Sequence, residues 1–289
     1  MTAATDTSSV ASDRAQSEPA RMRKGLFSAD NVISIGVFRV LLIGSLLALW
    51  EIGATWWFDP FFFSKPSLVG VKFAQELANP DLYHDIYVTG VELFFGYTGG
   101  AVAGIVLGIL LANWLFVAKI FDPLLLALNA IPRIAIAPML IVWFGIGMAS
   151  KMFLAATLVF FITFFNTHAG VRSVDRALLN VARVQGATSW QLFTKVIMPS
   201  ASSWIITGLK MSLPFALAGV IFGEFLVASE GLGYRLNHYS TSYDTTGGIT
   251  MIFLMMLIMM VLTAIADWVE NWLLRWRPKS ETAGATPRA

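Results

Sequence analysis

The chain has 289 residues, of which 56% are hydrophobic and 13% are charged, and its formal net charge is +2. Globular domains usually carry about 25% charged residues, so this composition indicates a polytopic membrane protein. The small net charge argues against nucleic acid as a partner, and the lack of cysteine excludes disulfides, thiolate chemistry and cysteine metal sites.

Residues 1–30 are rich in Ser, Ala, Thr and Asp and are expected to form a disordered tail. They lack the short apolar region and cleavage site of a signal peptide. Residues 31–85 are expected to hold the first transmembrane helix and then an external interfacial helix over 66–79. In that second segment Val69, Phe73 and Leu77 recur at helical spacing.

A helix needs about 20 apolar residues to cross a bilayer. Six segments reach this length, namely 32–58, 86–114, 120–144, 152–171, 200–227 and 249–272. Prolines interrupt two of them, at Pro132 and Pro138 in the third and at Pro214 in the fifth. The sequence therefore predicts an all-α integral membrane protein with six transmembrane helices, followed by a tail over 277–289.

Basic residues are distributed unequally between the two sides that six spans define. The side with both termini holds most of them, namely Arg14, Arg21, Arg23, Lys24, Lys119, Arg172, Arg176, Arg183, Lys195, Arg275, Arg277, Lys279 and Arg288. The other side holds Lys65, Lys72, Lys151 and Arg235. Because cytoplasmic loops carry an excess of Lys and Arg, both termini and the segment 173–199 are predicted to be cytoplasmic.

Four glycines recur every fourth residue in the second span, at Gly96, Gly100, Gly104 and Gly108. They share one helix face, which lets another helix approach closely. Two interpretations stay open. The face can serve helix packing within one chain, or it can form a gate or dimer seam.

Four polar side chains are candidates for lining a translocation pathway, namely Asn129, Arg133, Asn166 and Glu224. A charge at the bilayer centre costs about 2.5–3.5 kcal/mol on insertion scales, so it should face protein or water. Arg133 can alternatively form a buried ion pair with Glu224 or Glu92. Asn166 can instead bond a neighbouring helix, and Lys210 can extend to the interface.

The segment 173–199 carries the signals of two short helices joined by a glycine. Asp175 or Ser173 can cap the first helix, and Gly186 can take the left-handed conformation that ends it. Thr188 and Gln191 match a capping box for the second helix, which Pro199 is expected to close. Apolar side chains remain uncovered there, namely Val184, Trp190, Leu192, Phe193 and Val196. They can lie on the bilayer or dock a cytoplasmic partner.

The sequence lacks the usual signatures of a catalytic subunit. It contains no G-x-x-x-x-G-K-[ST] phosphate loop, no H-E-x-x-H and no G-x-S-x-G. No catalytic residues, no metal site and no cofactor are therefore expected. Energy for uphill transport would have to come from an ion gradient or from another subunit.

The same segment resembles a motif of the permease subunits of type I ABC importers, written E-A-A-x3-G-x9-I-x-L-P. When the sequence is aligned on Gly186, Asn180, Val181 and Ala182 fall at the E-A-A positions. Val196 falls at the I position with Val for Ile, and Met198-Pro199 fall at L-P with Met for Leu. "ALNAIPRIAIAPMLIVWFGIGMASK", "FFNTHAGVRSVD" and "GEFLVASEGLGY" are similar to the nitrate/sulfonate/taurine-type branch. Asn180 departs from the motif, so an ion pair from the family's acid does not carry over.

This resemblance implies a MetI-like fold in the bacterial inner membrane, with an ABC transmembrane type-1 domain over 86–276. It implies two cytoplasmic ATPase subunits, a second and usually identical permease protomer, and an external or periplasmic solute-binding protein. The segment 173–199 would then dock the ATPase through Ala182, Gly186, Ala187, Trp190 and Phe193. A small anion such as a sulfonate or nitrate is the expected substrate.

Two other classes of function stay open. An ion-coupled secondary transporter would use inverted repeats and membrane-embedded carboxylates, of which Glu224 is the main candidate. A membrane enzyme or structural scaffold is the other, and the missing catalytic signatures count against an enzyme.

Overall fold

The computed structural model describes residues 32–57 and 59–275, and it contains no strand within these ranges. The chain divides into two compact units, residues 1–57 and 58–289. The first unit contains α2 (Val32–Trp56). This helix is apolar around most of its circumference and largely exposed, as expected of a helix in lipid. The predicted tails over 1–30 and 277–289 lie outside the described residues.

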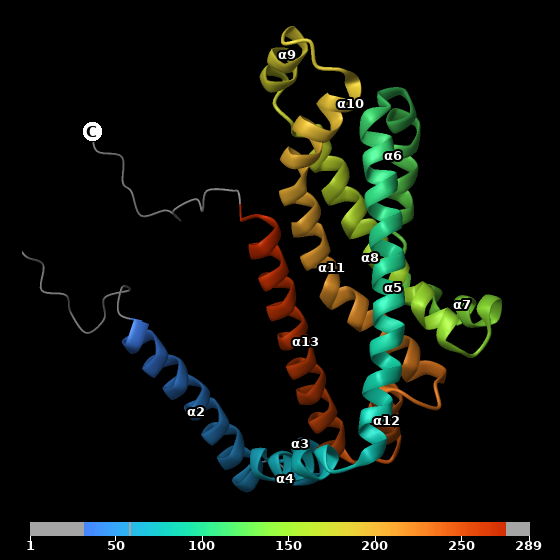
Figure 1. Cartoon of the computed structure of the whole chain (residues 1–289). Helices are drawn as coiled ribbons and strands as arrows, with labels where there is room; N and C mark the ends of the chain where they lie inside the picture. Colours follow the sequence, from blue (N-terminus) through green and yellow to red (C-terminus); the bar gives the residue numbers. More distant parts are fainter. Residues whose placement is uncertain (1–31, 58, 276–289) are drawn as a thin grey trace, which may run out of the picture. The chain divides into compact units, whose positions relative to one another are not determined.

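In the second unit, every regular element within residues 59–275 is a helix (Figure 1). In chain order these are α3 (Pro60–Phe63), α4 (Pro66–Leu77), α5 (Pro80–Asn113), α6 (Leu115–Asn129), the 3₁₀ helix η1 (Arg133–Ile136), α7 (Ala137–Phe144), α8 (Met148–Arg172), α9 (Arg176–Val184), α10 (Ser189–Leu192), the π-helix η2 (Phe193–Ile197), α11 (Met198–Val227), α12 (Leu232–Thr241) and α13 (Thr245–Leu273). Within this unit α9 and α10 lie at one end, and α3, α4 and α12 lie at the other (Figure 1).

Within the described ranges, five helices are long and apolar enough to cross a membrane, or six if one bent pair counts as a span. The prediction of an all-helical, multi-pass membrane protein is confirmed. The third predicted span differs from a simple kinked helix, because α6 and the η1–α7 segment meet at 79°. Pro132 lies at this break. Proline lacks an N–H donor and disfavours helical geometry in the preceding residue, so the chain leaves the helix there.

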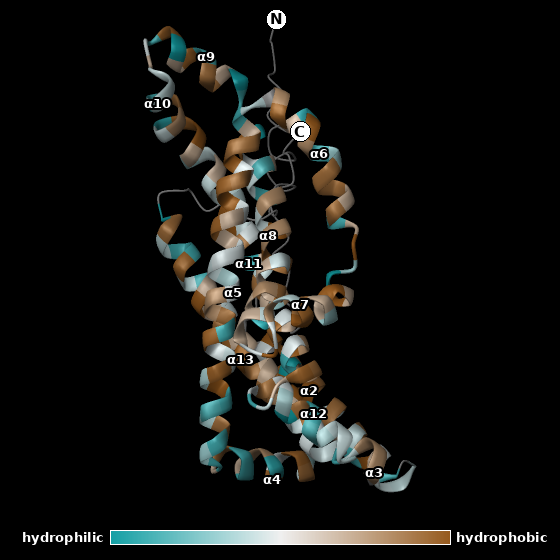
Figure 2. Ribbon diagram, turned by 90° about the vertical axis from the view of Figure 1, so that its right-hand side faces the viewer, coloured by the Kyte–Doolittle hydropathy of each residue, from teal (hydrophilic) through white to brown (hydrophobic). Residues whose placement is uncertain are grey.

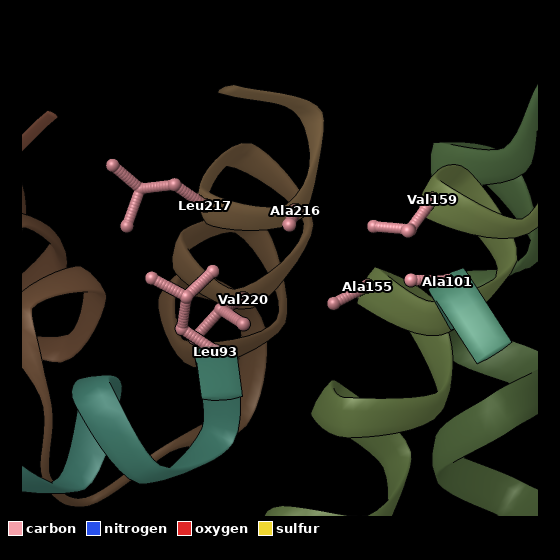
Figure 3. Close-up of a cluster of buried hydrophobic side chains, with 7 residues drawn as sticks. All are labelled: Leu93, Ala101, Ala155, Val159, Ala216, Leu217 and Val220. Carbon is pink, nitrogen blue, oxygen red and sulfur yellow. The ribbon is translucent and has the colours of Figure 1, made fainter. Parts of the chain in front are cut away.

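The helices α5, α8 and α11 form the core of the second unit. Their shared cluster consists of Leu93, Ala101, Ala155, Val159, Ala216, Leu217 and Val220. Figure 3 shows Ala216 of α11 pointing toward Ala155 and Val159 of α8. These small side chains keep the helices close, which is the main source of helix association in lipid.

A second cluster of buried apolar residues joins α12 to the long helices α5 and α13. Leu82 of α5, Leu232 of α12, and Met251 and Leu254 of α13 are all buried in it. The predicted interfacial helix corresponds to α4. Asn79 follows it and caps the start of α5, because its side-chain oxygen accepts from Asp81 N–H. Figure 2 shows that hydrophilic residues concentrate near both ends of this unit, while the spans between them are mostly hydrophobic.

Candidate docking elbow and buried polar network

The two short helices α9 and α10 are specified by local hydrogen bonds. Asp175 caps α9 by accepting from Ala177 N–H at 2.8 Å. Thr188 and Gln191 form the predicted capping box, in which each side chain accepts from the other residue's N–H, at 3.3 and 2.9 Å. Because both caps lie within a few residues of the helix that they start, this geometry follows directly from the sequence.

The turn between α9 and α10 is a Schellman motif. Gly186 has a φ of +81°. Its N–H bonds the carbonyl of Arg183 at 2.9 Å, and Ala187 N–H bonds the carbonyl of Ala182 at 3.0 Å. This pattern satisfies carbonyls that the end of α9 would otherwise leave free. We call residues 175–192 the elbow.

The elbow exposes apolar side chains to its surroundings. Val184 is 88% exposed and Trp190 is 72% exposed, and Leu178 and Val181 are also exposed. The Trp190 and Phe193 rings lie 5.9 Å apart. The prediction of an uncovered side chain was wrong for Leu192, which is 8% exposed, and Phe193 and Val196 are half-buried.

The end of the elbow also differs from expectation. Pro199 was predicted to close the second short helix, but α10, η2 and α11 form one continuous helix over Ser189–Val227. The five-residue π-helix ends at Ile197, two residues before Pro199. A π-turn moves the carbonyl that the proline ring would otherwise strike, so the helix accommodates the proline without ending. A groove of about 680 Å³ lies beside this turn, lined by residues that include Leu178, Lys195 and Trp204.

Arg133 lies at the bend of the α6–η1–α7 segment. Its Nη2 donates to the Asn129 carbonyl oxygen at 3.0 Å and also to the Asn129 side-chain oxygen. Its guanidinium lies 4.4 Å from the centre of the Phe161 ring. Among the described residues no carboxylate lies within 4 Å of it, so the alternative of an ion pair with Glu224 or Glu92 is wrong. Both acids have other partners.

Asn166 lies on α8 at a close contact with α11. Its Nδ2 donates to the Ile162 carbonyl at 2.8 Å. A Cβ atom on Gly208 would lie 2.7 Å from the Asn166 Cβ, so the glycine makes room for this side chain. The contact between the two helices at this point therefore depends on both residues.

Glu224 is fully buried near the end of α11. It accepts from the Thr89 hydroxyl at 2.7 Å and from Gly233 N–H at 2.7 Å. Its predicted role in the pathway stays a prediction, because the carboxylate exposes no surface in this conformation.

A buried ion pair that the sequence analysis missed joins α5 to α8. Lys151 Nζ lies 2.6 Å from Glu92 Oε1, and the two side chains are 5% and 0% exposed. The prediction had placed Lys151 in a loop between two spans. It lies instead in the first turn of α8, because that helix begins at Met148. The sequence does show an acid, Glu92, inside an apolar span, which indicates a buried partner. It does not identify that partner, because Lys151 is 59 residues away along the chain.

A second ion network joins α4, α5 and α12. Arg235 pairs with Glu76 at 3.0 Å and with Asp85, and Tyr239 donates to Glu76. Burial, followed by the adjacent Glu76 carboxylate, raises the pKa of Tyr239, so its phenol stays protonated and can donate.

A separate ion cluster joins α11 to α13. Lys210, which was expected to extend to the interface, pairs with Asp267 at 2.5 Å and with Glu270.

The four glycines of α5 all face α8. A Cβ atom on Gly96 or Gly108 would lie within 3 Å of an atom of α8. On Gly100 and Gly104 it would meet Ala156 and Thr163 more closely still. The structure thus puts this face in contact with a helix of the same chain.

The sequence matches the family of the "Binding-protein-dependent transport system inner membrane component" over residues 104–277. It is 34% identical over 213 residues to the formylaminopyrimidine transport permease protein ThiX of Halalkalibacterium halodurans, covering 72% of this chain and 83% of that protein. It is 32% identical over 201 residues to the riboflavin transport system permease protein RibX of Chloroflexus aurantiacus, covering 69% and 75%.

The putative aliphatic sulfonates transport permease protein SsuC of Bacillus subtilis is 31% identical over 198 residues, covering 68% of this chain and 72% of that protein. Among solved structures, an inward-facing MetNI methionine ABC transporter chain aligns with a TM-score of 0.58 and 20% identity. The alignment covers 65% of this chain and 94% of that one. At this identity the structural likeness concerns the fold.

Proposed function

The chain belongs to the family of binding-protein-dependent transport system inner membrane components, and from this premise we propose how it works. It is a permease subunit of an ABC importer in the plasma membrane. In our proposal it forms a translocation pathway with a second, identical protomer. Two cytoplasmic ATPase subunits supply the energy, and an external solute-binding protein delivers the substrate. The α9–α10 end and both termini then lie in the cytoplasm.

The observation that carries this proposal is the uncovered apolar face of the elbow. Val184 projects from the short helix α9 and Trp190 from the start of the continuous helix Ser189–Val227, and both side chains are exposed. A helix as short as α9 is marginal alone, and an apolar face beside a defined turn fits a groove on a partner. Ala182, Gly186 and Ala187 would fix the turn, while Trp190 and Phe193 would enter the ATPase.

Replacing Trp190 with Asp is expected to lower recovery of a co-expressed ATPase with the tagged permease by at least tenfold. Buried tryptophans at interfaces often contribute 2 kcal/mol or more, which is about thirtyfold in affinity. Tyr243→Asp is the matched control. It changes an equally exposed aromatic residue with positive φ at the opposite end of the unit. Equal ATPase recovery with both variants would contradict docking through the elbow.

We propose that the pathway includes Asn129, Arg133 and Asn166, and that the substrate is a small anion such as a sulfonate or nitrate. Arg133 supports the anion because it is a cation within a broken span and has no carboxylate partner in the described part of the chain. A cation in such a place needs water or an anion to offset its desolvation. The guanidinium has donors left over after its bonds to Asn129.

Replacing Arg133 with Gln is expected to reduce uptake of ethanesulfonate or nitrate by about ten- to a hundredfold, the loss of one charged hydrogen-bonding group. Uptake is measured in proteoliposomes with the ATPase and the binding protein. Arg133→Lys should retain more uptake, since it keeps the charge. ATPase recovery should be unchanged in both variants. Full uptake by Arg133→Gln, or no uptake of either probe by the unaltered chain, would contradict the anion assignment.

An ion-coupled secondary transporter remains the second candidate. The specific observation in its favour is the pair of buried acids, Glu92 and Glu224, inside the spanning helices. Embedded carboxylates are what such transporters use to bind coupling ions. Uptake into vesicles that is driven by an ion gradient without ATP would support this function over ours.

A further inference from the structure

One lysine side chain holds three helices together. Lys151 starts on α8, passes Gly223 of α11 and ends on Glu92 of α5. A Cβ atom on Gly223 would lie 3.0 Å from Lys151 Cγ, so the glycine provides the space for the lysine stem. The ammonium group then meets the Glu92 carboxylate in a region closed to solvent.

The next residue of α11 ties in a fourth helix. Glu224 binds Thr89 of α5 through one oxygen and the N–H of Gly233 in α12 through the other. Thr89 also accepts from Leu232 N–H at 2.9 Å, and Asp85 accepts from Gly231 N–H at 2.6 Å. The first N–H groups of α12 are thus satisfied by side chains from α5 and α11 rather than by water.

These groups would be costly to separate. A buried charge that loses its partner keeps its full desolvation penalty, so the α5–α8 contact cannot open here without exposing both ions to lipid or leaving them unpaired. The glycine face of α5 continues the same contact for several turns. Close packing and buried charge therefore act on the same helices.

We propose that Glu92, Lys151 and Glu224 form a static clamp that keeps α5, α8, α11 and α12 together as one rigid block throughout the transport cycle. This inference rests on the proposed importer function. The movements of transport then take place between protomers and at the bent α6–η1–α7 segment. The charges of the clamp hold helices together and carry no proton or coupling ion.

The test is a double-variant cycle in the complete permease–ATPase complex. Lys151→Met alone and Glu92→Leu alone each leave one buried charge without its partner. Each is expected to lower the apparent Tm by roughly 10 °C. The double variant replaces the pair with apolar side chains of similar volume and also removes Glu92 Oε2, a buried acceptor without a donor. It should return to within a few degrees of the unaltered complex and recover ATP-driven uptake.

Lys72→Met is the matched control, because it breaks a half-exposed pair with Asp244 at 3.4 Å. Exposed ion pairs contribute little, so its Tm should change by about 2 °C or less. A double variant that is stable but does not transport would overturn the clamp, since the charges would then act in transport. A double variant as unstable as the single ones would also overturn it. Failure of the importer function itself would show separately, as uptake by the unaltered complex without ATP.

Discussion

Valine at position 100 is expected to prevent α5 from packing on α8, whereas valine at position 99 is expected to be tolerated. A Cβ atom at Gly100 would lie 2.9 Å from both Ala156 Cα and Val159 Cβ, and still closer to a backbone oxygen of α8. Backbone atoms cannot turn aside as a flexible side chain can. Overpacking of this kind costs about 3 kcal/mol or more, which is a large part of a protein's stability.

Gly99 provides the comparison within the same helix. A Cβ atom there would have no atom within 4 Å in the described structure. Both substitutions change helix propensity equally, so their difference isolates the contact with α8. The measurement is the yield of monodisperse protein by size exclusion in detergent, together with the apparent Tm. If Gly100→Val and Gly99→Val behave alike, the glycine face does not serve packing within the chain and the gate or dimer seam becomes the better interpretation.

Alanine at position 231 is expected to detach α12 from the spans. Gly231 has a φ of +103°, which costs about 1–2 kcal/mol for a residue with a Cβ atom. That Cβ would also collide with the Glu224 carboxylate and push it away from Thr89 and Gly233. The loss of buried hydrogen bonds adds to this backbone strain, so the substitution is expected to lower the free energy of unfolding by about 4 kcal/mol.

The control for this substitution is Gly145→Ala. Gly145 also has a positive φ, +81°, but a Cβ there would have no atom within 4 Å among the described residues. Gly145→Ala should therefore destabilise the protein only by the backbone strain of a residue with positive φ. Hydrogen exchange measures the difference, because Gly231→Ala should release protection across α12 while Gly145→Ala leaves it intact. Similar protection of α12 in the two variants would show that Glu224 does not anchor this helix.

The elbow could be predicted from the sequence because its determinants are local. The Asp175 cap, the left-handed Gly186 and the Thr188–Gln191 box each involve residues within a few positions of one another. Local hydrogen-bonding rules are sufficient for such features. The apolar spans were predictable for the same kind of reason, since length and hydropathy alone indicate them.

The partners of the buried charges could not be predicted in this way. Glu92 and Lys151 are 59 residues apart, and only the register of α5 against α8 brings them together. Hydropathy favoured a loop position for Lys151, because the apolar run that predicts the span begins at Met152. The prolines were also ambiguous. Pro132 lies at a sharp bend, while Pro199 is accommodated by a π-turn within a continuous helix.

The continuity of that helix has a mechanical consequence. Ser189–Val227 contains 39 residues, so it is about 58 Å long, well beyond the roughly 30 Å of a bilayer's hydrocarbon core. The exposed Trp190 at its start and the buried Glu224 near its end belong to the same continuous helix. A partner that contacts Trp190 would therefore act on a helix that continues without a break as far as Glu224. Because Glu224 also bonds Thr89 of α5 and Gly233 of α12, such a contact would be linked through one helix to two others.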